Sequence, residues 1–232
     1  MFDLMFRVVA SLGLIAGLIY WLAYSWRDED DWLCSVIKTT TLAPLALFWL
    51  VTSYLGQDPV WIMALGLGFG VLGDFCLSRP GPRAFLAGMA AFGIGHLIYA
   101  AALIARGAEL GFDGVAGLEF WAAVALVALV VSTEIWLAPR TGALRWPVRA
   151  YVVLIAAMGV AAILVPANPG TAELRLGAAL FIASDLFLAV RMFVLQRETP
   201  RRLLGAVLWP AYVLGQFLLF FGSVLFWTFP QA

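Results

Sequence analysis

Residues 60–78 read VWIMALGLGFGVLGDFCLS, and residues 172–195 read AELRLGAALFIASDLFLAVRMFVL. Each run is about as long and apolar as a bilayer-crossing helix requires, yet each contains an aspartate, Asp74 or Asp185. An aspartate in the middle of such a helix costs roughly 2.5–3.5 kcal/mol on insertion scales, and intramembrane carboxylates usually mark functional sites. The two runs therefore predict a membrane protein with a buried polar site that includes both aspartates.

The composition of the whole chain supports this class. Of 232 residues, 64% are hydrophobic and 12% are charged, whereas soluble domains carry about 25% charged residues. The formal net charge is zero, so nothing favours a nucleic-acid partner. Cys34 and Cys76 are too few for a disulfide framework, and we expect them to pack as apolar residues. The first apolar run is long enough to be a retained helix, and we treat 1–232 as a single transmembrane helical domain.

Apolar runs separated by turn-forming residues predict an all-α, polytopic membrane protein with eight transmembrane helices. The predicted spans are 4–25, 32–54, 60–78, 84–105, 118–137, 148–165, 172–195 and 203–228. Pro44 predicts a kink in the second span. No obligate protein partner is implied, and membrane lipid is the expected surrounding.

The distribution of arginines predicts the orientation of these spans. Most of them lie in the first, third, fifth and seventh connections: Arg27, Arg79, Arg83, Arg140, Arg145, Arg149, Arg197, Arg201 and Arg202. Basic loops stay in the cytoplasm, so we expect both termini outside. The buried polar residues then share the inner half of the membrane, and their site should open toward the cytoplasm. Arginine-rich, lysine-poor usage indicates a bacterial inner membrane.

A short motif occurs twice. Gly73-Asp74-x-x-Leu77 is followed in the next span by Gly95-His96, and Ser184-Asp185-x-x-Leu188 is followed by Gly215-Gln216. Four spans separate the copies, which predicts a 4+4 parallel pseudo-repeat with facing aspartates. Two short matches in an apolar chain also arise by chance, so both interpretations stay open.

Two further ionisable residues each allow two interpretations. Lys38, the only lysine, either reaches the cytoplasmic headgroups or turns inward and pairs with an aspartate. His96, the only histidine, is either a core residue or a hydrogen-bonding and proton-shuttling group. A site of aspartates with His96 could bind a metal, but no ligand spacing indicates one, so we expect no metal and no cofactor.

The remaining candidates are polar residues that share helix faces with these groups. We expect supporting or substrate-binding roles for Tyr99, Ser184, Tyr212 and Gln216, with structural roles as the alternative. No phosphate-binding loop, serine-hydrolase elbow, zincin motif or CxxC is present. These absences argue against common hydrolases and nucleotide-dependent enzymes.

The order of these residues resembles the YhhN family over nearly the whole chain. The resemblance rests on Lys38, Gly73-Asp74-x-x-Leu77, His96-x-x-Tyr99, Ser184-Asp185 and Tyr212-x-x-x-Gln216. It implies an eight-helix membrane lysoplasmalogenase, which hydrolyses the vinyl ether of a lysophospholipid to a fatty aldehyde and glycerophosphoethanolamine or glycerophosphocholine. It also implies that Asp74 and Asp185 are the catalytic pair.

Vinyl ethers are stable to base but are hydrolysed in acid. The implied reaction therefore needs a protonated carboxyl as the acid, together with an ionised carboxyl that stabilises the cation and activates water. Two buried aspartates that share one proton supply both forms. Arg79, Arg83, Arg145, Arg149 or Lys38 would hold the phosphate of the substrate. A proton-coupled transporter is the main rival, against which we count the absence of an inverted repeat and of a clearly broken helix pair. A purely structural or lipid-binding membrane protein is the third interpretation.

Overall fold

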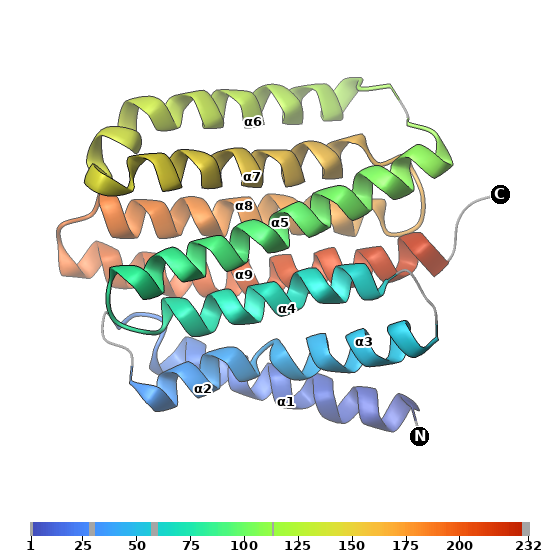
Figure 1. The fold of residues 1–232 in the computed structure, drawn as a ribbon, viewed down its shortest axis with the longest axis horizontal. Helices are drawn as coiled ribbons and strands as arrows, with labels where there is room; N and C mark the ends of the chain where they lie inside the picture. The colour runs from blue at the N-terminus through green and yellow to red at the C-terminus, as the bar shows by residue number, and fades with distance from the viewer. Residues whose placement is uncertain (1, 28–30, 57–59, 113, 229–232) are drawn as a thin grey trace.

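The structure is a computed structural model that describes residues 2–27, 31–56, 60–112 and 114–228. These residues form a bundle of nine α-helices with two short 3₁₀ turns and no strand (Figure 1). The helices are α1 (Phe2–Ala23), α2 (Trp32–Thr40), α3 (Ala43–Leu55), α4 (Trp61–Leu77), α5 (Pro82–Leu110), α6 (Gly117–Trp136), α7 (Arg145–Leu164), α8 (Thr171–Phe193) and α9 (Glu198–Thr228).

The predicted spans coincide with these helices, but their number is confirmed only in part. Six helices in the described ranges are long and apolar enough to cross a membrane, and α2 with α3 makes a seventh if the bent pair is one span. The helix α4 is apolar but has only 17 residues. Eight full-length spans are therefore not established, although the all-helical membrane class is.

The second predicted span is broken rather than merely kinked. The axes of α2 and α3 differ by 41° at Thr41 and Leu42, and Pro44 lies in the first turn of α3, where its missing N–H is harmless. A Cβ atom on Gly13 of α1 would lie 2.5 Å from the Thr41 carbonyl oxygen, so the glycine gives this carbonyl room. This break corrects the expectation that no helix pair is broken.

Glycines allow close helix contacts in both halves of the chain. A Cβ on Gly95 would lie 3.1 Å from the Gly66 carbonyl oxygen, which joins α5 to α4. A Cβ on Gly177 would lie 2.9 Å from the Gly215 carbonyl oxygen, which joins α8 to α9. Small residues allow such approach in membranes. A close helix contact at a glycine in each half is compatible with the pseudo-repeat, which stays a prediction.

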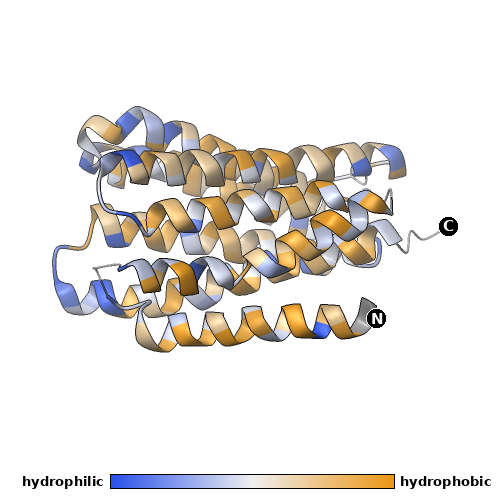
Figure 2. Ribbon diagram, turned by 60° about the horizontal axis from the view of Figure 1, so that its bottom comes forward, coloured by the Kyte–Doolittle hydropathy of each residue, from blue (hydrophilic) through white to orange (hydrophobic). Residues whose placement is uncertain are grey.

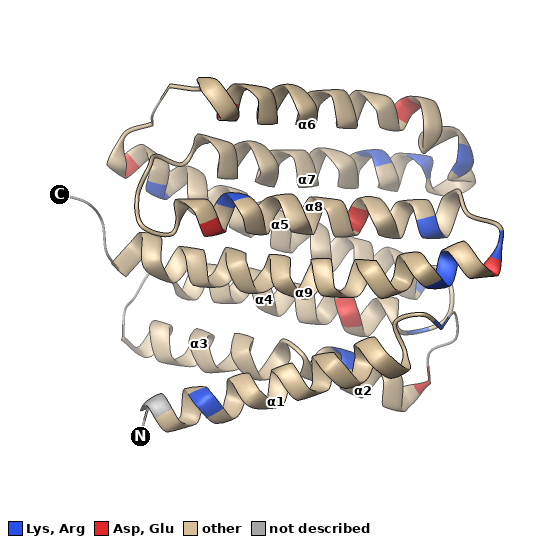
Figure 3. Cartoon of the chain, turned by 180° about the vertical axis from the view of Figure 1, so that it is seen from behind, with Lys and Arg blue, Asp and Glu red and all other residues tan. Residues whose placement is uncertain are grey.

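The helices consist mostly of apolar residues along their length, as Figure 2 shows. Leu118, Ile135 and Leu55 are more than three-quarters exposed, which suits contact with lipid rather than water. Most basic residues gather at the end where α1, α4, α6 and α8 finish (Figure 3). We call it the basic end. The first residues of α1 and the last of α9 lie at the opposite end (Figure 1).

Candidate active site

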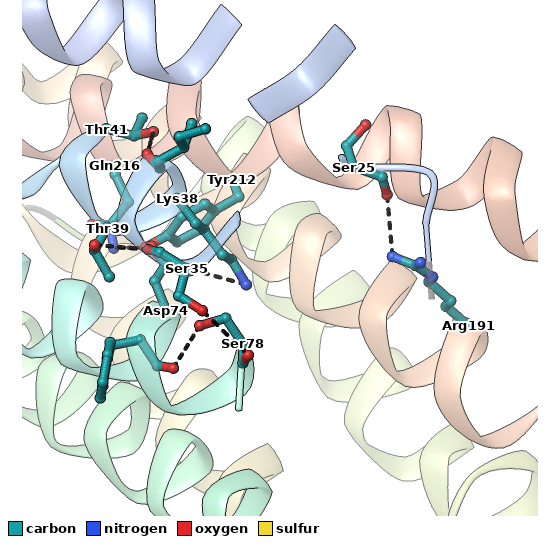
Figure 4. Close-up of polar contacts among 12 residues, drawn as sticks. Ser25, Ser35, Lys38, Thr39, Thr41, Asp74, Ser78, Arg191, Tyr212 and Gln216 are labelled. Atoms are coloured by element: carbon teal, nitrogen blue, oxygen red, sulfur yellow. Dashed lines mark hydrogen bonds and ion pairs between the residues drawn. The ribbon is translucent and has the colours of Figure 1, made fainter. Parts of the chain in front are cut away.

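Asp74 lies in the last turns of α4 with its side chain almost fully buried. Its Oδ2 accepts a hydrogen bond of 2.7 Å from the Tyr212 hydroxyl of α9. Its Oδ1 lies 3.6 Å from Lys38 Nζ of α2, and the lysine side chain is only 12% exposed. Figure 4 shows Lys38 and Tyr212 converging on Asp74. Lys38 thus turns inward and pairs with an aspartate instead of reaching toward the lipid headgroups.

A directed chain of hydrogen bonds ends at this carboxylate. The Tyr99 hydroxyl donates to Gln216 Oε1 at 2.8 Å. Gln216 Nε2 then donates to the Tyr212 hydroxyl at 3.5 Å, and Tyr212 donates to Asp74. Because every donor points toward Asp74, the network stabilises its ionised form.

The glycine face of α4 makes room for this chain. A Cβ on Gly66 would lie 2.5 Å from the Tyr99 ring, and one on Gly70 would lie 2.6 Å from Gln216 Nε2. Since real Cβ atoms do not approach this closely, larger residues would displace the tyrosine or the glutamine. The spacing of glycines ahead of Asp74 therefore serves the polar network and helix packing together.

Asp185 has different surroundings on α8. Its Oδ2 accepts a 3.0 Å hydrogen bond from the Tyr151 hydroxyl of α7 and lies 3.5 Å from His96 Nε2 of α5. Neither contact is with a lysine or an arginine. Tyr151 was absent from the predicted site residues, because a tyrosine in a membrane span is as often a belt residue as a ligand.

The hydrogen bond of His96 assigns its tautomer. Its Nδ1 lies 2.6 Å from the Phe92 carbonyl oxygen, which can only accept, so Nδ1 carries a hydrogen. In the neutral ring Nε2 is then an acceptor. This atom is buried and makes no hydrogen bond, and it faces Asp185 Oδ2. A proton on Asp185 would satisfy it, which a carboxylate cannot do.

Both aspartates line one cavity of about 70 Å³ near the basic end. Lys38, Tyr212 and Ser184 line it too. The Ser184 hydroxyl donates to the Phe181 carbonyl oxygen at 2.7 Å, so its hydrogen is used within α8.

Phosphate binding stays a prediction, and of the residues predicted to hold the phosphate, Lys38 lines this cavity. Its lining includes Arg191 and none of Arg79, Arg83, Arg145 or Arg149. Arg191 donates to the backbone carbonyls of Ser25 and Arg27, at 3.3 and 2.5 Å (Figure 4). Sequence reasoning missed it because an arginine near the end of a span is usually interfacial.

Arg79 and Arg149 have other partners at the basic end. Arg79 donates to the Asp31 carbonyl oxygen at 2.9 Å and to Ser35. Arg149 donates from Nε and Nη2 to the two carboxylate oxygens of Glu134. Within the described ranges, no group of three histidine, cysteine or acidic side chains is arranged to hold a metal ion.

Comparison with known proteins places these residues in context. The chain is 32% identical over 87 residues to the lysoplasmalogenase TMEM86B of Rattus norvegicus, an alignment that covers 37% of this chain and 36% of the rat protein. It is 30% identical over 177 residues to a lysoplasmalogenase of Mycobacterium tuberculosis, covering 72% of this chain and 63% of that protein. It is 28% identical over 209 residues to the lysoplasmalogenase TMEM86A of Bos taurus, covering 86% and 83%.

The chain thus spans about a third of the length of the rat relative and less than two thirds of the mycobacterial one. No solved structure matches it. The sequence model of the YhhN family, by contrast, matches residues 33–223, which include both aspartates, Lys38, His96, Tyr212 and Arg191. The resemblance inferred from the residues is confirmed: the chain belongs to the YhhN family.

Proposed function

We propose that the protein is a lysoplasmalogenase, which hydrolyses the vinyl ether bond of a lysophospholipid inside the membrane. One observation carries the proposal: Asp74 and Asp185, with side chains only 3% and 10% exposed, line one cavity and have different charged or basic neighbours. Donors and Lys38 surround Asp74, which favours a carboxylate. Asp185 accepts a hydrogen bond from Tyr151 but pairs with no lysine in the described structure, and the acceptor nitrogen of His96 that faces it favours the neutral acid. The lysoplasmalogenase relatives support the choice of substrate.

In this mechanism Asp185 is the general acid. It transfers its proton to the outer carbon of the vinyl ether, and the positive charge that forms is shared between the adjacent carbon and the ether oxygen. The Asp74 carboxylate stabilises this cation across the cavity and removes a proton from the attacking water. A hemiacetal results, with Asp185 ionised and Asp74 protonated.

Collapse of the hemiacetal restores both residues. Asp185 takes the hydroxyl proton of the hemiacetal, the carbon–oxygen bond to glycerol breaks, and Asp74 gives its proton to the departing oxygen. One water is consumed, and a fatty aldehyde and a glycerophosphodiester leave. Arg191 and Lys38, both in the cavity wall, are the cations that would bind the phosphate.

The test is aldehyde release by detergent-purified protein given a lysoplasmalogen or its saturated-ether analogue. We expect cleavage of the vinyl ether alone, because only that bond gains a stabilised cation on protonation. Equal cleavage of both ethers, or of neither, would refute the proposal.

The broken span keeps a proton-coupled transporter as the second candidate. Transporters often build their sites at discontinuous helices, and Lys38 lies two residues before the end of α2, where the span breaks. This candidate predicts that labelled lysolipid crosses the membrane of sealed liposomes unchanged. Hydrolysis in detergent, where no compartments exist, distinguishes the two functions.

For localisation we propose the bacterial inner membrane, with the basic end in the cytoplasm and both termini outside. The cavity with the aspartates would then open to the cytoplasmic leaflet. A fluorescent protein that folds only in the cytoplasm should be dark when fused to the C-terminus and bright when inserted between α8 and α9. The reverse pattern would invert the orientation.

A further inference from the structure

Asp185 belongs to the walls of two cavities, not one. Besides the polar cavity that it shares with Asp74, it lines an apolar cavity of about 90 Å³ whose wall comes mainly from α5, α6, α7 and α8. Leu77 and Phe92 are also common to both. The carboxyl that would protonate the substrate therefore lies where a polar space and an apolar space adjoin.

The apolar cavity offers almost no polar partner to a ligand. Among its lining residues, Thr133 donates its hydroxyl hydrogen to the Val130 carbonyl oxygen at 2.7 Å. The Trp136 indole donates to the Ser132 hydroxyl at 3.1 Å, and Tyr151 donates to Asp185. With these donors used internally, the cavity suits a hydrocarbon.

A further cavity of about 200 Å³ adjoins the apolar one between α6, α7 and α8. Leu126 and Ile182 line both spaces, so they form the junction. Gly159 lies against both side chains, because a Cβ on it would be 2.8 Å from Leu126 Cδ2 and 2.9 Å from Ile182 Cδ1. The glycine thus leaves these two side chains the space that they occupy.

The part of these cavities that extends from Asp185 away from the basic end fits one lipid chain. On α8 their lining runs from Phe193 to Arg175, which is paired with Glu119 at 2.6 Å, and ten residues separate Arg175 from Asp185. Ten residues of α-helix span about 15 Å, and one leaflet is half of a hydrocarbon core about 30 Å thick. Ala122 and Ala179 in the far wall are exposed at the surface, so the space opens sideways toward lipid.

We propose that the joined cavities hold the hydrocarbon chain of the lysolipid, and that the far cavity sets the preferred chain length. The position given to the headgroup rests on the proposed function. The position given to the hydrocarbon chain does not depend on it. The chain runs from Asp185 away from the basic end, and the phosphate lies toward Lys38 and Arg191. A lipid in the leaflet at the basic end has its headgroup and chain in this same orientation, so it enters the cavities without flipping across the membrane.

The test compares wild-type protein with Ala122→Phe, which fills the far cavity, and with Ala128→Phe. Ala128 is exposed on the same helix and lines none of the three cavities. Saturated-ether lysolipids with short and long chains serve as uncleaved probes, and binding is measured as the rise in unfolding temperature. Aldehyde release from the matching vinyl ethers is measured in parallel.

We expect Ala122→Phe to weaken binding of the long chain about tenfold or more, with the short chain and Ala128→Phe unaffected. Equal long-chain affinity in all three proteins would overturn the assignment, as would an equal loss in both variants. Chain-dependent binding without aldehyde release from any vinyl ether would refute the proposed function and support the chain site. The two failures are therefore distinguishable.

Discussion

His96 Nε2 lies 3.5 Å from Asp185 Oδ2, and the opposite nitrogen of the same ring is held by the Phe92 carbonyl at 2.6 Å. This arrangement gives Asp185 a neighbour that accepts a proton but does not donate one while the ring is neutral. Both aspartates accept a hydrogen bond from a tyrosine, but Asp74 faces a lysine where Asp185 faces the histidine. The two carboxyls are thereby chemically distinct although both are buried in one site.

Replacing either aspartate by asparagine should abolish aldehyde release, but the two variants should differ in stability. Asp74→Asn leaves Lys38 without its carboxylate, and loss of one partner of a buried pair costs about 3–5 kcal/mol. Asp185→Asn exchanges one neutral group for another and should cost much less. Thermal unfolding in detergent measures the difference.

The matched control is Lys38→Met combined with Asp74→Asn, which removes both charges. It should recover most of the lost stability and none of the activity. If instead Asp185→Asn were the less stable single variant, the assignment of acid and base would be reversed. Full aldehyde release by both single variants would exclude the aspartate pair altogether.

His96→Phe should lower turnover by about tenfold to a hundredfold, a part of the ~10²–10⁴ that general acid catalysis supplies. The phenyl ring keeps the contact with Phe181, whose centroid is 4.5 Å from the imidazole, but removes the nitrogen that faces Asp185. Proton transfer should then limit the rate more strongly, so the solvent deuterium isotope effect on kcat should rise. An unchanged isotope effect would indicate a packing role.

Removing hydroxyls along the chain that ends at Asp74 should separate catalysis from stability. Tyr212→Phe deletes the bond to the carboxylate and should reduce kcat about tenfold, since a hydrogen bond to a charged group contributes about 1.5–3 kcal/mol. Tyr99→Phe leaves Gln216 Oε1 buried without its donor and should cost about 1–3 kcal/mol of stability, with a smaller effect on kcat. Equal effects of both variants on kcat would contradict this division.

The fold was largely predictable because a bilayer imposes the length and polarity of each span, and apolar runs are visible in one sequence. The break after α2 was predictable only in part. Pro44 indicates a disturbance, but its position and angle depend on the Thr41 carbonyl meeting Gly13 of another helix. Contacts between distant segments leave little trace in the local pattern.

The site shows the same limit. Asp74, Asp185 and His96 stand out because a buried ionisable residue is costly wherever it occurs. The contacts between these residues cannot be inferred from the sequence, because they depend on which helices face each other. Tyr151 and Arg191 could each have served at the membrane interface, and only the packing of α7 and α8 brings them to the site.

Gly177→Ala should disrupt the bundle, whereas Gly68→Ala should not, although both glycines lie inside helices. A Cβ on Gly177 would meet the backbone nitrogen of Leu219 at 2.5 Å, and nothing lies within 4 Å of one on Gly68. Backbone atoms yield less readily than side-chain ends, so α8 must move away from α9 and carry Asp185 with it. We expect a lower unfolding temperature and lost aldehyde release for Gly177→Ala. Gly68→Ala should be neutral or up to about 1 kcal/mol more stable through its helix propensity. Equal unfolding temperatures would show that the α8–α9 contact tolerates a methyl group and does not fix the position of Asp185.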